Sequence, residues 1–495
     1  MTAHEPKDRF PAPRYRDTVL RPAFAGAKAH RGLMRQVDQA HLVMLAEQDI
    51  VPRDHARAIL AAIEETDAAL DLAELRDAGA HEDLFYLLEA ELIARVGPEV
   101  GGCLHVGRSR NDLEATLFKL ALKPALQQAL SEMVDLCAAL HSLAEREKAT
   151  IVLAYTHGQP AQPTTLGHYL GSILECLLRH CDRMLAAYEV VDLCPLGAAA
   201  ITTTGFPISR TRVAELLGFA AVQENSYGCI ASVDYLTGCF SALKLALLDI
   251  GRLCQDLAFW CGFEVDQLRV SDGYVQVSSI MPQKRNPLAL EHLRTMASLA
   301  AGQCETVIST VHNTPYADMV DAEAPTQQAG QAAFATFGRV MRLLVGVVEG
   351  LSVNPQSVAR NIARSTATMT ELADSLVRLE GVSFRTAHEI TSRLARQMLE
   401  ERLTMADLTV TLLGQVFEAE VGRPLRLQAA EVQRLTTPEH FVAVRDIFGG
   451  PGQSALSQSL AQYEDRLLQV RGQLDAYADA QARAEQKLAE AVAAL

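Results

Sequence analysis

The sequence predicts an all-α protein built around a central bundle of five long helices. Apolar residues recur every three or four positions along five segments, strand signals are weak, and polar loops rich in Gly and Pro separate the segments. The apolar stripes run over residues 122–143, 166–188, 236–260, 290–311 and 334–351. Each is longer than a typical globular helix, and long helices with one apolar face pack together as bundles.

The composition is that of a globular protein with an excess of negative charge. Of the 495 residues, 49% are hydrophobic and 21% are charged, which excludes intrinsic disorder. The chain has 45 Lys and Arg against 60 Asp and Glu, a net charge of −15. This balance disfavours nucleic acid as a partner. A small anionic substrate can still bind where arginines and backbone N–H groups gather.

The sequence shows no sign of a membrane or secreted protein. The N-terminus lacks an apolar signal region, and charged residues interrupt the helical stripes. Most of the 10 cysteines lie among apolar helical positions and none forms a CxxC pair, so they indicate neither a disulfide framework nor a metal site. We therefore expect a cytoplasmic protein without a membrane partner.

Breaks in the helical pattern predict three domains. Residues 1–105 are expected to form an N-terminal helical domain, with residues 1–24 as an extended arm rich in Pro and Arg. Residues 106–353 would form the long-helix bundle. Asn354-Pro355 then breaks the pattern, and residues 354–495 are expected to form a C-terminal helical domain whose last helix spans about 453–491.

Four polar stretches interrupt the helical pattern and are the best candidates for a functional site. They are residues 105–112, 155–164, 195–210 and 276–287, and three of them directly precede a long helix. Backbone N–H groups are exposed at the start of a helix and attract anions, and loops frequently carry function. Any one stretch alone is equally compatible with a capped helix or a solvated surface loop.

Taken together and in order, these stretches resemble the fumarase/aspartase superfamily and, within it, argininosuccinate lyase. The segments HVGRSRND, YTHGQPAQPTTLGH and SSIMPQKRNP resemble its three signature segments. The segments EDLFYLLEAEL (82–92) and VSFRTAHE (382–389) resemble flanking segments, so the likeness covers about residues 25 to 450. The resemblance implies a three-domain all-α fold. It also implies a homotetramer with a 20-helix core, in which each site takes residues from three chains.

The resemblance further implies a lyase that splits a C–N bond in an N-substituted aspartate and releases fumarate, with no metal or organic cofactor. The proton to be removed lies on the carbon beside a carboxylate and is a very weak acid. Its removal builds a second negative charge on that carboxyl group, an aci-carboxylate. Fixed hydrogen-bond donors and cations must stabilise this dianion. A base must remove the proton from the carbon, and an acid must protonate the leaving nitrogen.

The family pattern carries these roles onto specific residues. Ser278 is the implied base, with Ser279 as the alternative, and Lys284 is implied to stabilise the dianion. His157 and Glu291 resemble the family's His–Glu pair, the candidate acid or proton relay. The residues implied in substrate binding are Arg108, Ser109, Arg110, Asn111, Thr156, Gln159, Ser279, Met281, Lys284, Asn286 and Tyr316.

Several positions depart from the argininosuccinate pattern. Val320-Asp321-Ala322-Glu323 stands where the family usually has Gln-Glu-Asp-Lys, Val233 replaces an Arg, and Phe85 replaces a His. The succinyl-binding residues are thus retained while those facing the leaving group are not. We therefore favour another N-substituted aspartate, an aminopolycarboxylate such as ethylenediamine disuccinate. The arginines of the arm are candidates to meet its distal carboxylate; they are Arg14, Arg16 and Arg21.

Three alternatives remain open at this point. Argininosuccinate lyase itself is the main rival. Adenylosuccinate lyase is weaker, because the loop reads Pro-Gln-Lys (282–284) rather than the usual Pro-His-Lys. A catalytically inactive helical scaffold is the third, and the joint retention of the implied catalytic residues argues against it.

Overall fold

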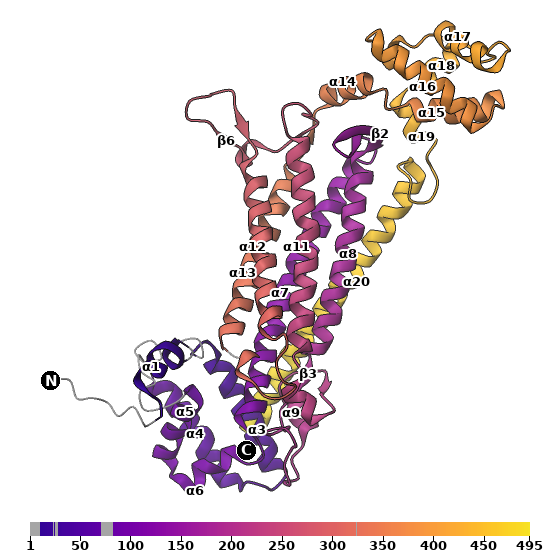
Figure 1. The fold of residues 1–495 in the computed structure, drawn as a ribbon. Helices are drawn as coiled ribbons and strands as arrows, with labels where there is room; N and C mark the ends of the chain where they lie inside the picture. The colour runs from indigo at the N-terminus through magenta and orange to yellow at the C-terminus, as the bar shows by residue number, and fades with distance from the viewer. Residues whose placement is uncertain (1–9, 23, 25–27, 71–82, 323) are drawn as a thin grey trace.

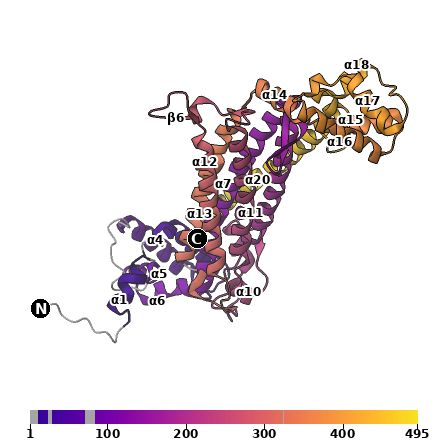
Figure 2. The same ribbon diagram turned by 45° about the horizontal axis from the view of Figure 1, so that its top comes forward.

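The computed structural model describes residues 10–22, 24, 28–70, 83–322 and 324–495. A long helical bundle carries a smaller helical region at each end, which gives the molecule an elongated shape (Figure 1). A view turned by 45° shows the same separation of the two end regions (Figure 2). The N-terminal region lies at the lower end of the bundle in Figure 1 and the C-terminal region at the upper end.

The five predicted long helices are confirmed. They are α7 (Arg110–Arg146), α8 (Leu166–Val191), α11 (Asp234–Trp260), α12 (Leu288–Thr310) and α13 (Ala324–Glu349). The predicted stripes form their shared core, in which one leucine from each helix has no solvent-exposed surface. These leucines are Leu140, Leu174, Leu243, Leu293 and Leu344. Burying each such side chain contributes about 2 kcal/mol, so the apolar spacing itself stabilises the bundle.

The N-terminal region packs around a second apolar core. Its elements are α3 (Arg31–Glu47), α4 (Arg53–Ala69), α5 (Leu84–Val96), α6 (Pro98–Gly101) and the 3₁₀ turns η2 (Lys28–His30) and η3 (Gly102–His105). The first turns of α7 and the short helix α9 (Arg210–Leu216) contribute to the same core. The start of the bundle is therefore fixed against this region.

The N-terminal arm differs from the extended segment that we expected. Residues 1–9, 23 and 25–27 lie outside the described residues, but Pro13–Tyr15 form a turn of helix (α1) that continues as the π-helical turn η1, Arg16–Leu20. Pro13 occupies a first-turn position, where its missing N–H costs nothing. The Thr18 hydroxyl also donates to the Arg14 carbonyl at 2.7 Å, which adds a local contact to the turn.

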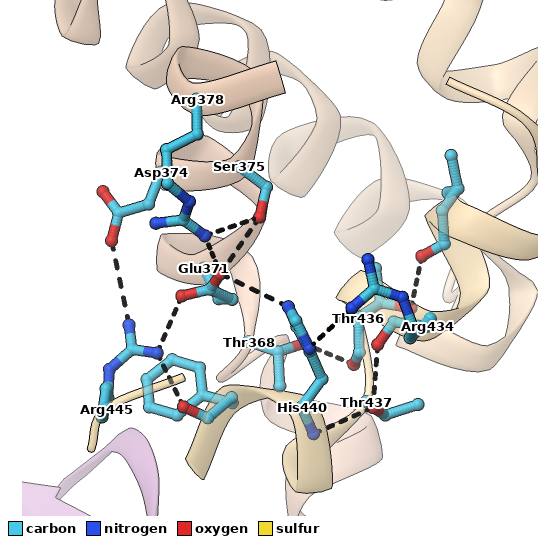
Figure 3. Close-up of polar contacts among 12 residues, drawn as sticks. Thr368, Glu371, Asp374, Ser375, Arg378, Arg434, Thr436, Thr437, His440 and Arg445 are labelled. Carbon is cyan, nitrogen blue, oxygen red and sulfur yellow. Dashed lines mark hydrogen bonds and ion pairs between the residues drawn. The ribbon is translucent and has the colours of Figure 1, made fainter. Parts of the chain in front are cut away.

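The C-terminal region has a core of its own. Its helices are α14 (Pro355–Ser365), α15 (Met369–Ser375), α16 (Phe384–Glu400), α17 (Val410–Val421), α18 (Ala429–Leu435) and α19 (Pro438–Ala443), with the turns η6 (Leu376–Glu380) and η7 (Met405–Asp407). Glu371 on α15 is buried and pairs with Arg378, and with Arg445 at 2.8 Å (Figure 3). His440 on α19 lies 3.6 Å from the same carboxylate. This ionic cluster ties α15 to the end of α19.

The last helix runs back along the bundle. α20 (Gln453–Ala493) begins at the upper end, packs against α7 and α8, and reaches the N-terminal region with Leu488. From the sequence we expect this helix in the C-terminal domain, but its apolar face belongs to the bundle and to the N-terminal core. The glycine-rich segment Gly449–Gly452 links the C-terminal region to this helix.

Short strands occur only at helix ends within the described residues, which confirms the all-α prediction. The pairs are β1 (Ile151–Thr156) with β2 (Gln159–Thr165), β3 (Leu193–Cys194) with β4 (Ala221–Val222), β5 (Leu268–Arg269) with β8 (Ser352–Val353), and β6 (Gln276–Val277) with β7 (Arg285–Asn286). Further short helical elements are α10 (Ser226–Ala231), η4 (Asp272–Tyr274) and η5 (Val320–Ala322).

One helical stretch in the described part of the chain, Val320–Glu349, is long and apolar enough to pass a length-and-composition test for a membrane span. Its core residues Phe337, Met341 and Leu344 are fully buried against the other bundle helices. Packing within the bundle therefore accounts for its apolar character.

Candidate active site

The segment that precedes α7 forms a tightly capped helix start at the lower end of the bundle. The Ser109 hydroxyl accepts the N–H of Asn111, and the Asp112 carboxylate accepts the N–H of Ser109 at 2.8 Å, which completes a capping box. The Ser109 hydroxyl also donates to the Asn111 side-chain carbonyl at 3.2 Å. Two residues implied in carboxylate binding are thus held together at a helix N-terminus.

Asp112 joins this helix start to the stretch 195–210. Its second oxygen accepts the backbone N–H groups of Gly197 and Ala199, both at 2.8 Å. Asn111 adds a longer contact, from its side-chain N–H to the Ala200 carbonyl at 3.4 Å. Gly197 and Ala199 both adopt positive φ, a conformation that is costly for Ala and that the Asp112 contacts help to hold.

Arg108 is buried, and its guanidinium does not face the solvent. The guanidinium donates to Asp38 on α3 at 2.7 Å, and its side chain is 2% exposed. The neighbouring His41 is fully buried, and its Nε2 lies 2.8 Å from the Val106 carbonyl. Burial and the nearby Arg108 lower the pKa of His41 to about 3, so this ring is neutral and donates. Asp38 and His41 thus anchor residues 106–108 to α3. This pairing of Arg108 differs from the direct substrate contact that we expected for it.

Arg110 and Tyr316 lie at the same end of the bundle. Arg110 donates to Asp83 at 2.6 Å and its guanidinium lies 4.9 Å from the Tyr86 ring centre. Tyr316, in the loop after α12, is 65% exposed and stacks on Tyr227 with ring centres 6.1 Å apart.

A surface depression beside Asn111 has an empty volume of about 520 Å³, including space open to solvent. Its lining includes Glu114, Tyr235, Asp318 and Asp321. Burial raises the pKa of Asp318 above its ordinary value, while the nearby positive charge of Arg110 opposes this rise. Glu82 and Glu323, which belong to segments quoted above, lie outside the described residues.

The second signature segment forms a hairpin turn at the upper end. Thr156 pairs with Gln159 across the turn, and His157 and Gly158 both have positive φ (54° and 72°), as two-residue hairpin turns require. Positive φ is uncommon for His, so the turn fixes His157 in a strained and exposed position. All three implied residues of this segment lie at the tip.

The third segment forms the loop between β6 and β7, also at the upper end. The pairs Gln276–Asn286 and Val277–Arg285 close its base. The Ser278 oxygen accepts two backbone N–H groups, from Met281 at 3.1 Å and from Ile280 at 3.4 Å. N–H donors that point at a hydroxyl oxygen stabilise its deprotonated form. Ser279 has no such contacts within the described chain.

The other implied residues of this region surround the same loop. Met281 and Lys284 are exposed on it, Asn286 is half-buried at its base, and Glu291 is exposed on the first turn of α12. Within the residues described here, the side chains of Lys284, His157 and Glu291 make no hydrogen bond or ion pair with their own chain. The implied His157–Glu291 contact is therefore not formed inside a single chain.

The implied residues form two groups at opposite ends of the bundle (Figure 1). Residues 108–111 and Tyr316 lie at the lower end. Residues 156–159, 278–286 and Glu291 lie at the upper end. At 1.5 Å per residue, the 37-residue helix α7 is roughly 55 Å long, so one chain cannot bring the two groups together.

Several residues that build the lower group do not stand out in the sequence. Asp38 and His41 of α3 hold residues 106–108, and two polar residues directly before the apolar run 42–46 were the available signal. Asp112 was not among the residues that the sequence implied for the site. Its contact with Gly197 joins segments 85 positions apart, and spacing in the sequence cannot reveal such a contact.

Comparison with known proteins identifies the family. Residues 29–302 match a family described as "Lyase", and residues 366–443 match one described as "Argininosuccinate lyase C-terminal". "Argininosuccinate lyase 2" of Agrobacterium fabrum is 46% identical over 98% of this chain and 97% of its own length. "Argininosuccinate lyase" of Methanosarcina barkeri is 35% identical over 87% of this chain and 86% of its own.

A solved structure of EDDS lyase in complex with formate superimposes with a TM-score of 0.85 and 30% identity, covering 94% of this chain and 92% of that one. The fold and the three segments define a helical lyase of the fumarase/aspartase superfamily. Within it, the chain belongs to the argininosuccinate lyase family. It is accordingly a carbon–nitrogen lyase that releases fumarate.

Proposed function

We propose that this enzyme eliminates an amine from an aminopolycarboxylate, such as ethylenediamine disuccinate, to give fumarate. The main support for the proposal is that the succinyl-binding residues are retained whereas the residues expected to face the leaving group are altered. The succinyl-binding positions Ser109 and Asn111 keep the family's residues at a capped helix start. The loop after α12 instead carries Val320, Asp321 and Ala322 where the family has polar contacts to arginine.

The depression beside Asn111 supports an amine-bearing leaving group. Carboxylates along its lining favour a cationic nitrogen, since opposite charges attract most strongly where water is partly excluded. The likeness to EDDS lyase over 94% of the chain supports the same substrate class. The proposed contact of the arm with a distal carboxylate has less support, because Arg16 and Arg21 both pair with Asp17.

In the proposed mechanism, the Ser278 oxygen removes the proton from the carbon beside the carboxylate. The N–H groups of Ile280 and Met281 stabilise the serine oxyanion that must form first. Lys284 and Asn286, with Ser109 and Asn111 of another chain, hold the aci-carboxylate. The developing charge falls on preorganised donors, and such an arrangement typically lowers a barrier by several kcal/mol.

The carbon–nitrogen bond then breaks, and its electrons leave with the nitrogen. His157, paired with Glu291 of a different chain, is the proposed source of the proton that the nitrogen takes up. Thr156, Gln159, Met281 and Tyr316 complete the substrate contacts. Arg108 and Arg110 position the carboxylate-binding segment through Asp38 and Asp83.

We propose that the working form is a homotetramer in which the bundles of four chains pack together. The distance between the two residue groups supports this assembly, because each group needs a partner from another copy. Opposed bundles bring the lower end of one chain beside the upper ends of its neighbours. Exposed apolar side chains on the bundle helices, such as Leu245, Leu248 and Leu299, are suited to that contact.

A direct assay tests the substrate. The purified enzyme is given ethylenediamine disuccinate or argininosuccinate, and fumarate release is followed by its ultraviolet absorbance. We expect kcat/KM for ethylenediamine disuccinate to exceed that for argininosuccinate by about 100-fold, the discrimination that lost polar contacts produce. The reverse ranking would identify an argininosuccinate lyase, a function favoured by the name of the 46% identical relative.

The cellular location is also a proposal. All ten cysteines are free in the structure, and unpaired cysteines are typical of proteins in reducing compartments. This supports a cytoplasmic enzyme.

A further inference from the structure

Three side chains with metal-binding atoms meet between α8 and α11, away from both ends of the bundle. Cys176 and His180 lie one turn apart on α8, and Asp249 faces them from α11. The Cys176 sulfur lies 3.2 Å from Asp249 Oδ2 and 3.8 Å from His180 Nε2. His180 Nε2 lies 3.0 Å from the same Asp249 oxygen.

These separations are close to those around a tetrahedral zinc ion. Bond lengths of about 2.0 Å to N and O and about 2.3 Å to S place the ligand atoms about 3.3–3.6 Å apart at tetrahedral angles. In the structure the thiol of Cys176 and the ring of His180 both donate hydrogen bonds to Asp249 Oδ2. A cation at the centre of the triangle would replace these hydrogens and keep the three side chains in place.

We propose that Cys176, His180 and Asp249 form a binding site for a divalent transition metal, with Zn²⁺ the ion that best fits the donor set. Thiolate, imidazole and carboxylate are all zinc ligands, and three protein ligands leave a fourth position for water. His180 is buried, whereas Cys176 and Asp249 are half-buried, so the fourth position faces the solvent. This site is independent of the proposed substrate.

The protons and charges can be accounted for when a divalent ion binds at this site. Cys176 loses its thiol proton to solvent and binds as a thiolate, and Asp249 already carries one negative charge. His180 stays neutral but must bind through Nε2, so its hydrogen moves to Nδ1. The charges of a divalent ion, one thiolate and one carboxylate then cancel, which limits the cost of placing the ion between two helices.

Arginines around the site set its affinity. Arg183 donates to His180 Nδ1 at 3.1 Å and must turn away when that nitrogen takes up the hydrogen. It is exposed, so it can rotate into solvent. Arg252 pairs with the other oxygen of Asp249 at 3.0 Å and is 83% exposed. Arg179 pairs with Glu175 at 2.8 Å, which offsets its charge.

The bound ion would fasten α8 to α11 in the middle of the bundle. The two helices already share the bundle core, where Leu174 and Leu243 are fully buried. A metal that bridges them adds a contact that the unfolded chain lacks, so it stabilises the folded state. Its role is structural, because the ligands are far from both groups of implied catalytic residues.

Cobalt titration of the full-length enzyme tests the site. Protein treated with a chelator is titrated with CoCl₂, and the thiolate-to-cobalt charge-transfer band is followed in the near ultraviolet. We expect one Co²⁺ per chain, displacement by ZnCl₂, and protection of Cys176 from alkylation, located by mass spectrometry. Arg183→Ala should tighten binding about tenfold, because it frees Nδ1 and removes a nearby positive charge.

Matched variants decide the outcome. Cys176→Ser and Asp249→Asn should each abolish the band while keeping the assembly and helical content of the wild type. Cys103→Ser is the control, because Cys103 lies 4.0 Å from His55 and, among the described residues, the two form no three-ligand cluster with a carboxylate. No metal uptake by the wild type would overturn the proposal. A band that survives in Cys176→Ser or in Asp249→Asn would overturn it as well, and using both variants guards against one that fails to fold.

Discussion

Asp112 accepts a hydrogen bond of 2.8 Å from the backbone N–H of Gly197, which joins the first turn of α7 to a loop 85 positions further along the chain. The same carboxylate accepts N–H groups from Ala199 and Ser109. It is fully buried, and burial raises its pKa to about 6 despite these donors. The organisation of the carboxylate-binding segment is therefore sensitive to mildly acidic pH.

The first prediction is that activity falls at acid pH because Asp112 becomes protonated, which gives the pH profile an acid limb. Below about pH 6 the carboxylate takes up a proton and accepts these N–H groups less strongly, so kcat/KM should fall with an apparent pKa of about 6. Asp112→Asn should lower kcat/KM about tenfold at pH 8 and remove this limb. A limb that persists unchanged in the variant would assign it to another group.

The same shift affects stability, with a definite sign. The folded pKa of about 6 lies above the ordinary value of 3.8, so the folded state binds the proton more tightly than the unfolded state does. The contribution of Asp112 to stability is therefore greatest below about pH 4 and declines as the pH rises to about 6. Urea unfolding of wild type and Asp112→Asn at several pH values measures this difference.

The second prediction separates the two loop serines. Ser278→Ala should lower kcat at least about 1,000-fold, because it removes the proposed base together with the two N–H contacts that serve it. Ser279→Ala should lower kcat/KM by less than about tenfold, because Ser279 would only contact substrate. Steady-state fumarate release measures both. Full turnover by Ser278→Ala would exclude that serine as the base.

The third prediction concerns the buried pair of Arg108 and Asp38. Arg108→Ala leaves the Asp38 carboxylate, 13% exposed, without its charge partner, and should lower the free energy of unfolding by about 3 kcal/mol. Thermal and urea denaturation measure this change. Arg146→Ala is the control, because its pair with Glu147 is exposed and worth less than about 1 kcal/mol. Equal effects of the two substitutions would contradict the buried role of Arg108.

The fourth prediction concerns the ionic cluster of the C-terminal region (Figure 3). Glu371→Gln removes the charge that pairs with Arg378 and Arg445, and should destabilise this region by about 2 kcal/mol. Hydrogen exchange should accelerate in α15 and α19 but not in the bundle. Glu389→Gln is the matched control, because its pair with Arg393 is exposed. Uniform acceleration along the whole chain would contradict a local role.

Periodicity was sufficient to predict the bundle. Stripes such as Leu236 to Trp260 marked α11 closely, because the apolar spacing of a long amphipathic helix is a local property. The placement of α20 was less predictable. Its sequence is rich in Ala and charge, and its packing along the bundle depends on contacts such as Leu460 and Leu467 with distant helices.

In the candidate site too, local sequence features were predictable and long-range contacts were not. The stretches that contain Ser109, His157 and Ser278 were found because polar residues with Gly or Pro interrupt helical patterns, and the roles of these residues came from the resemblance to the family. The residues that hold the lower group in place could not be predicted in this way, because Asp38 and Asp112 form their contacts with distant parts of the chain. The burial of Arg108 also escaped prediction, since neighbouring arginines in one motif can differ in exposure, here 2% for Arg108 and 34% for Arg110.

Subunit complementation tests the central claim most directly, namely that each site combines the two ends of different chains. Asn111→Ala alters the lower group and Ser278→Ala the upper group, and each variant alone should be nearly inactive. When the two are dissociated, mixed and reassembled, about one quarter of the sites should receive wild-type residues from both contributing chains. We expect activity to return toward about 25% of wild type. Mixed tetramers, verified by mass, that stay as inactive as either parent would contradict the account.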